Sequence, residues 1–102
     1  MKPLNYFMES LNMKEIKIDC STIETKADFH AALASGLSFP EYYGKNLDAL
    51  YDCLAEIGQD TRLILTDWHH LEYRLGDYSG KAVYVFHCAI RENPHLTVLL
   101  EP

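Results

Sequence analysis

The sequence predicts one small α/β domain in which a three-stranded parallel sheet is covered by about four helices. Strand-type and helix-type hydrophobic periods alternate along the chain in the order strand, helices, strand, helices, strand. Strands that are separated by helices pair in parallel through right-handed crossovers. The length of 102 residues allows one hydrophobic core and excludes a second independently folding domain.

The domain is expected to begin at residue 14. Residues 1–12 carry no clear hydrophobic period, so residues 1–13 are interpreted as an N-terminal extension outside the fold and residues 14–102 as the domain. Residues 14–19 then alternate between charged and apolar side chains, which predicts a strand with one buried face.

The first helix is predicted from a capping-box sequence, in which Thr25 is followed three positions later by Asp28. Phe29, Ala32 and Leu33 follow at helical spacing. Gly36 is the predicted end of this helix, because glycine commonly follows the last helical residue.

The second helix is predicted to follow an irregular loop. Residues 37–45 contain a proline, a glycine and two tyrosines without a consistent period, which indicates a loop. Asn46 is a favourable N-cap, and the helix is expected to end near Gly58. Its buried stripe is predicted to consist of Leu47, Leu50, Leu54 and Ile57.

A second strand and a short third helix are predicted next. Residues 61–66 contain three consecutive aliphatic residues between polar ones, as expected for a strand covered on both faces. The short helix is expected between Asp67, as its cap, and Gly76, with Leu71 and Leu75 turned inward.

Residues 79–93 favour a strand by propensity and a helix by pattern. Residues 83–86 are β-branched or aromatic. Ala82, Val85, Phe86, Ala89 and Ile90 nevertheless follow helical spacing over about four turns, which is long for a strand. We therefore predict a helix that ends at Asn93-Pro94, followed by a last strand over residues 96–100.

The composition is that of a globular chain, with 48% apolar and 24% charged residues. Nine basic and fifteen acidic residues give a formal charge of −6, which argues against sequence-independent nucleic-acid binding. No apolar run reaches the length of a membrane span, and the N-terminus lacks a secretory signal, so we expect a cytoplasmic protein. Cys20, Cys53 and Cys88 form no C-x-x-C pair, which favours reduced thiols over disulfides or a zinc site.

The most informative feature is a row of acids on the predicted second helix. Asp48, Asp52 and Glu56 are spaced four residues apart, which places them on one helix face. Like charges at this spacing repel, at a cost of about 0.2 to 0.5 kcal/mol per pair. Residues 40–60 hold five acidic residues and one basic residue, a formal charge of −4. Two interpretations stay open at this point: a solvated helix face, or an electrostatic patch for a cation-rich partner.

Three tyrosines flank these acids. Tyr42, Tyr43 and Tyr51 supply aromatic area of the kind that anchors protein interfaces. Packing in the core is the competing interpretation, and it is preferred for Tyr43. Tyr51 is expected at the edge of the acidic face.

Residues 39–53 carry a resemblance to a known family. They read FPEYYGKNLDALYDC and are followed by Leu54. This run resembles the signature of the barstar family, the intracellular inhibitors of small microbial ribonucleases. The resemblance continues in residues 28–30, 63–68 and 85–100, so it covers most of residues 14–100.

The resemblance implies a barstar-like fold and a mode of action. In the family, the second helix and the loop before it block the ribonuclease active site, with acidic side chains where RNA phosphates would bind. Carried over, Asp52 would occupy the catalytic phosphate site and Asp48 would contact a neighbouring basic group. Tyr42 would stack near the catalytic histidine of the enzyme, and Gly44 and Asn46 would touch the rim.

The chain departs from the family pattern at the edge of this surface. Tyr51 stands where the family often has Trp, and Ala55 and Ile57 stand where the best-known member has a hydroxyl and an aromatic contact residue. Cys88 stands where that member has a glutamate, whereas Glu92 matches an acidic position on the last helix. These differences bear on which ribonuclease is the partner. The predicted partner-binding residues are Tyr42, Gly44, Asn46, Asp48, Tyr51, Asp52, Ala55, Ile57 and Glu92.

We therefore predict a cytoplasmic protein that is not an enzyme and uses no cofactor. Its predicted partner is a small basic ribonuclease of the barnase type or a ribonuclease toxin, bound 1:1 by a protein that is monomeric when free. Nucleic acid and membranes are not expected partners. The first alternative is a binding or immunity module of the same fold for another toxin or basic protein. The second is a catalyst in which Asp48 and Asp52 share Mg²⁺.

Structural roles are expected for the histidines, Trp68 and Cys53. His69 and His70 are adjacent, and adjacent residues on a helix point about 100° apart, so they do not form a metal-ligand pair. His30, His87 and His95 are scattered along the sequence. Trp68 is expected in the core, and Cys53 is interpreted as a buried inert thiol.

Overall fold

The computed structural model describes residues 13–102, so the expected N-terminal extension lies, except for Met13, outside the described residues. Strands β1 (Lys14–Asp19), β2 (Thr61–Thr66) and β3 (Leu96–Leu100) form one parallel sheet in the order β1-β2-β3. In the register, Ile16 of β1 lies beside Leu63 of β2, which lies beside Val98 of β3. These rows of aliphatic side chains form the sheet side of the core.

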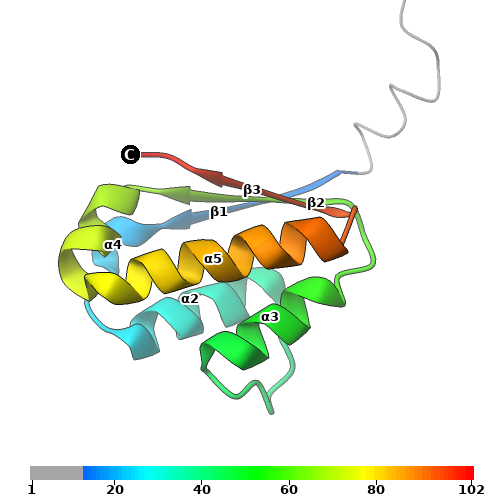
Figure 1. Cartoon of the computed structure of the whole chain (residues 1–102), viewed down its shortest axis with the longest axis horizontal. Helices are drawn as coiled ribbons and strands as arrows, with labels where there is room; N and C mark the ends of the chain where they lie inside the picture. Colours follow the sequence, from blue (N-terminus) through cyan, green and yellow to red (C-terminus); the bar gives the residue numbers. More distant parts are fainter. Residues whose placement is uncertain (1–12) are drawn as a thin grey trace, which may run out of the picture.

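Four α-helices accompany this sheet in the described part of the chain: α2 (Lys26–Leu37), α3 (Leu47–Ala55), α4 (Trp68–Leu75) and α5 (Asp77–Glu92). A 3-10 turn, η1 (Cys20–Thr22), follows β1. Figure 1 shows α2, α3 and α5 on one side of the sheet and α4 at the end where the strands finish. The predicted α/β class is therefore confirmed. No helix within residues 13–102 combines the length and hydrophobicity that crossing a membrane requires.

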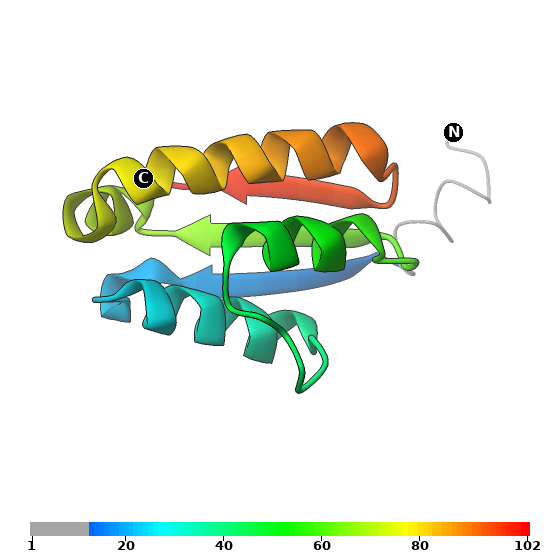
Figure 2. The ribbon, with the colours of Figure 1, turned by 60° about the horizontal axis from the view of Figure 1, so that its bottom comes forward.

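The helices cover one face of the sheet, which corrects the expectation that β2 is covered on both faces. Figure 2 shows α2, α3 and α5 together on the same face. Leu63 and Leu65 of β2 are fully buried beneath them. On the other face Ile64 is also buried, but it lies in the register between Lys17 and Leu99, and Leu99 is exposed. Among residues 13–102, no helix covers this side of β2, which lies between β1 and β3.

Helix α2 begins where predicted and ends later. The hydroxyl of Thr25 accepts from the Asp28 N–H at 3.1 Å, and the Asp28 carboxylate accepts from the Thr25 N–H at 3.2 Å. Gly36 lies inside the helix, and the left-handed residue Ser38 follows its end. A Cβ at Gly36 would lie 3.2 Å from Ile16 of β1. The glycine therefore allows α2 to approach β1 closely, which the sequence does not reveal.

The residue before α4 is the predicted one, but it does not cap the helix. Asp67 does occupy the position before the helix, but its φ is 54° and its side chain makes no capping hydrogen bond. Leu71 is fully buried, as predicted, and Leu75 is half-buried. Trp68 packs in the core with its ring 6.3 Å from that of Phe86, which confirms the expected role.

Helix α5 confirms the helix that was predicted over residues 79–93 from the spacing of apolar residues, although the residue types there favour a strand. The residues on its buried face are Ser79, Ala82, Phe86 and Ala89. Ile90, which was expected to face inward, is 38% exposed, because it lies off this stripe. The helix ends at Glu92, immediately before the predicted stop at Asn93-Pro94.

Asn93 also explains where α3 ends. Its Nδ2 donates to the carbonyls of Leu54 and Ile57, both at 2.9 Å, and its Oδ1 accepts from the His95 N–H. Helix α3 ends at Ala55 rather than near Gly58, and this amide bonds to the Leu54 carbonyl in its last turn and to the Ile57 carbonyl just beyond it. The buried side chain of Asn93 thus fixes the end of α3 to the end of α5.

We expect Asn93→Ala to lower the free energy of unfolding by about 2 to 4 kcal/mol. The change removes the amide that donates to both carbonyls: the Ile57 carbonyl loses its side-chain donor, and the Leu54 carbonyl keeps only a long bond of 3.4 Å from the Ile57 N–H. A buried group that loses its partner costs about 1 to 3 kcal/mol. Urea unfolding measures this value. Gln59→Ala, at an exposed position with no side-chain hydrogen bond from its amide, is the control and should change stability by less than about 0.5 kcal/mol. Equal effects of the two substitutions would contradict this role of Asn93.

Candidate functional site

The acids of α3 form an exposed row opposite its buried leucines. Leu50 and Leu54 are fully buried and attach the helix to the core, so Asp48 and Asp52 face outward. Glu56 continues the row at the C-cap. Within residues 13–102, none of these three carboxylates takes part in an ion pair. Their charge therefore faces solvent without a counter-ion from the described part of the chain.

The loop before α3 presents one tyrosine and buries the next. Tyr42 is 87% exposed, whereas Tyr43 is buried with its ring 4.9 Å from Phe39. The prediction that Tyr43 packs in the core is confirmed. Lys45 adopts a left-handed conformation with φ 54°, after which Asn46 is extended. Asn46 then caps α3, as predicted, by accepting from the Ala49 N–H at 2.8 Å.

A buried imidazole holds this loop against the helices. Nδ1 of His30, on α2, lies 2.6 Å from the hydroxyl of Tyr43, and Nε2 lies 2.6 Å from the hydroxyl of Tyr78 on α5. In a neutral ring, one nitrogen donates and the other accepts. Burial lowers the pKa of His30 and raises the pKa of both Tyr43 and Tyr78. The network was not predicted, because its members are far apart in the sequence.

Asp52 lies at the boundary between two hollows in the surface. A groove of about 1060 Å³ separates α3 from α5, and a smaller hollow of about 470 Å³ lies between α3 and the loop. Asp52 lines both. Of the predicted site residues, the groove also contains Asp48, Tyr51 and Glu92, and the smaller hollow contains Tyr42, Gly44 and Ile57.

Two predicted site residues line neither hollow. Asn46 serves the start of α3, and Ala55 is half-buried in its last turn. The groove instead contains residues of α5 that sequence reasoning missed, among them Lys81, Tyr84 and Arg91. These three residues share one side of α5, next to its buried stripe, and this helical spacing could have identified them from the sequence.

Cys53 beside the acidic row and Cys20 in the core are not poised for thiolate chemistry. Cys53 is half-buried rather than buried as expected, and its pKa is raised by burial and by the adjacent carboxylates of Glu56 and Asp52. Cys20 is fully buried, and burial raises its pKa to about 11. A high pKa keeps a thiol protonated at neutral pH. In the described part of the chain, no three His, Cys, Asp or Glu side chains are placed to hold a metal ion.

Comparison with known proteins identifies the family. Residues 13–100 match the family described as "Barstar (barnase inhibitor)". The chain belongs to the barstar family. It is 36% identical over 81 residues to a protein of Bacillus subtilis (strain 168) named "Putative ribonuclease inhibitor YrdF". The aligned region covers 78% of this chain and 89% of that protein. The resemblance carried by residues 39–53 is thus confirmed, and the family name indicates an inhibitor rather than an enzyme.

We expect acid to destabilise the protein through His30. Because the pKa of His30 is lowered in the fold, the unfolded chain binds a proton that the folded protein does not, in the range below the ordinary value of about 6.5. The free energy of unfolding should therefore fall as the pH drops below about 6.5, by up to about 1.4 kcal/mol per pH unit. Urea unfolding between pH 5 and 8 measures this slope.

His30→Gln is the control, because its amide does not titrate. Its stability should depend less on pH in the same range, and the difference between the two proteins isolates the contribution of His30. An identical slope in both would show that the pH dependence has another source.

Proposed function

We propose that this protein inhibits a small basic ribonuclease by placing Asp52 in the phosphate-binding site of the enzyme. The observation that carries the proposal is the unpaired acidic row of α3, in which Asp52 lies between two hollows. The family and the relative named as a ribonuclease inhibitor support the enzyme class. Asp48 contacts a neighbouring basic group of the same active site.

Inhibition of this kind requires only binding. The formal charge of −4 on residues 40–60 attracts a basic surface and raises the rate of encounter. In the complex, the Asp52 carboxylate meets guanidinium or ammonium groups in a site without water. Charge-assisted hydrogen bonds on both sides then offset the cost of desolvation. Because α3 is capped by Asn46 and fixed by Asn93, little of this binding energy is lost in ordering the helix.

The surrounding residues complete the proposed footprint. Tyr42 supplies an exposed ring that stacks on the enzyme, with Gly44 and Asn46 at the rim. The remaining proposed contacts are Tyr51, Ala55, Ile57 and Glu92. We propose that residues 14–102 act as a monomeric domain that binds the ribonuclease 1:1 in the cytoplasm, without a cofactor and without catalytic activity.

We expect Asp52→Ala to weaken binding to barnase by about 3 kcal/mol or more, because it leaves the basic cluster of the enzyme desolvated and unpaired. Titration of RNA cleavage by barnase measures this loss at low and high salt. Wild-type protein should inhibit stoichiometrically, with slower association at high salt. The melting temperature of the variant should be unchanged or higher, since repulsion from Asp48 and Glu56 is relieved.

Glu101→Ala is the matched control, because it removes the same charge at an exposed position outside both hollows. It should bind like the wild type. A loss below about 0.5 kcal/mol in Asp52→Ala would exclude the phosphate-mimicking role. If a tenfold excess of wild-type protein leaves barnase and other small basic microbial ribonucleases active, the proposed enzyme class is wrong, and an immunity role toward another basic protein becomes the better explanation.

A further inference from the structure

The groove between α3 and α5 has walls of different charge. Helix α3 contributes Asp48 and Asp52 to it, and no basic residue. On the facing helix, positions 81, 84, 88 and 91 share one side, because they are three or four residues apart. This stripe contains Lys81 near one end and Arg91 near the other. The α5 wall also contains Asp77 and Glu92, so it carries two positive and two negative groups, whereas the α3 wall is only negative.

The two cations are available to a partner. Lys81 and Arg91 are both exposed, and in residues 13–102 neither lies within ion-pair distance of a carboxylate. Asp77 and Glu92 line the ends of the same groove but do not pair with them. These positive charges are therefore not neutralised by the neighbouring acids through direct contact.

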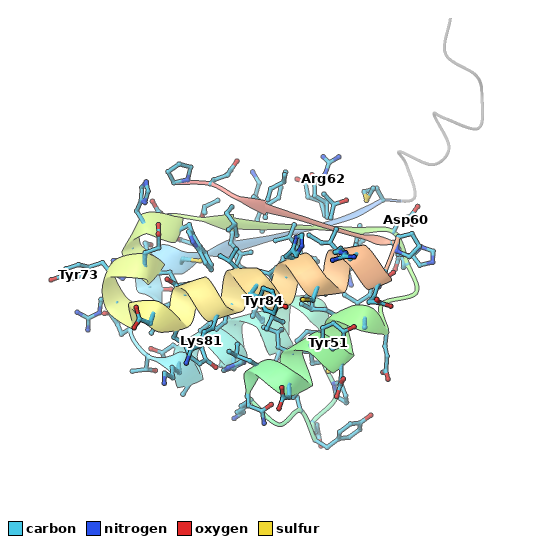
Figure 3. All side chains as sticks on the ribbon, in the orientation of Figure 1. Tyr51, Asp60, Arg62, Tyr73, Lys81 and Tyr84 are labelled. Carbon is cyan, nitrogen blue, oxygen red and sulfur yellow. The ribbon has the colours of Figure 1, made fainter. Side chains whose placement is uncertain are left out.

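Aromatic and aliphatic side chains lie between the charged walls. Tyr84 is 68% exposed and lines the groove together with Tyr51, and the half-buried residues Leu47 and Val85 add apolar surface. Figure 3 shows Lys81 and Tyr84 on α5 and Tyr51 on α3, along the side where the two helices run next to each other. Exposed tyrosines above apolar surface are typical of interface anchors.

We propose that the bound nuclease inserts into this groove a segment that carries a carboxylate. The carboxylate pairs with Lys81, and the segment packs on Tyr84, while the basic active site of the nuclease faces Asp52. The inference rests on the proposed function and adds the chemistry of the neighbouring part of the partner. Since Asp52 lines both this groove and the hollow beside the loop, one partner can reach both regions.

Electrostatic complementarity argues for a carboxylate in particular. A nuclease that was basic over its whole footprint would bring positive charge against Lys81 and Arg91, and like charges facing each other disfavour a complex. A partner with an acidic group beside its basic site satisfies both walls in only one orientation. The groove therefore selects the rotation of the partner about α3 and excludes nucleases that lack this group.

Reversing the charge of Lys81 tests this inference, because the two explanations predict opposite changes in affinity. Against a basic enzyme, Lys81→Glu should strengthen binding if only the overall charge matters, because the inhibitor becomes more acidic. If a carboxylate enters the groove, the same change should weaken binding to barnase by about tenfold or more, chiefly through faster dissociation. Lys17→Glu, an identical reversal on the opposite face of the sheet, is the matched control and should stay within about twofold of the wild type.

A pair of tyrosines tests the apolar part of the groove. Tyr84→Ala should weaken binding to barnase by about tenfold, because it removes a ring that the partner covers. Tyr73→Ala is the matched control: Tyr73 is 81% exposed but projects from α4, outside the groove. All four positions are exposed, and thermal unfolding of each variant should resemble that of the wild type.

The results separate the two proposals. If wild-type protein binds neither barnase nor another small basic microbial ribonuclease, the proposed function fails. If the wild type binds and Asp52→Ala does not, but Lys81→Glu binds as well as or better than Lys17→Glu, the groove does not receive a carboxylate. A Tyr84→Ala variant that binds within about twofold of the wild type would show that the partner does not cover the groove at all.

Discussion

The arrangement of the site depends on one buried imidazole. His30 is 1% exposed, and both of its ring nitrogens hydrogen-bond to tyrosine hydroxyls, one in the loop before α3 and one at the start of α5. Three segments that are distant in the sequence therefore share a single neutral side chain. Because a neutral ring has one donor and one acceptor nitrogen, one tyrosine hydroxyl accepts from it and the other donates to it. The loop that presents Tyr42 is thus attached to the core through the residue next to it.

This attachment allows α3 to carry a charge distribution that it would not tolerate alone. A helix of nine residues is too short to be stable in isolation, and repeated like charges weaken it further. Packing of Leu50 and Leu54, a cap from Asn46 and the amide of Asn93 hold it in the folded protein. The acidic row is therefore preorganised by the rest of the molecule, and the electrostatic repulsion is already present before any partner arrives.

Features that depend on neighbouring residues could be predicted from the sequence, whereas features that depend on contacts between distant residues could not. The capping box at Thr25 and the four-residue spacing that exposes Asp52 are short-range signals, and both predictions agree with the structure. Gly36 was misinterpreted as a helix end, because only the packing of α2 on β1 shows why a glycine is there. The end of α3 was misplaced, because Asn93 is almost forty residues away. Tyr84 and the strand order likewise emerge only when the helices and strands are assembled.

The position of Asn93 also affects when the protein can become functional during synthesis. The carbonyls of Leu54 and Ile57 receive their side-chain donor from a residue 39 and 36 positions later in the chain. A ribosome adds residues in order, so a growing chain displays the acidic helix sequence before the amide that fixes the end of that helix has been made. A chain that stops before Asn93 therefore carries the charges of the acidic row without this contact to hold the helix in place.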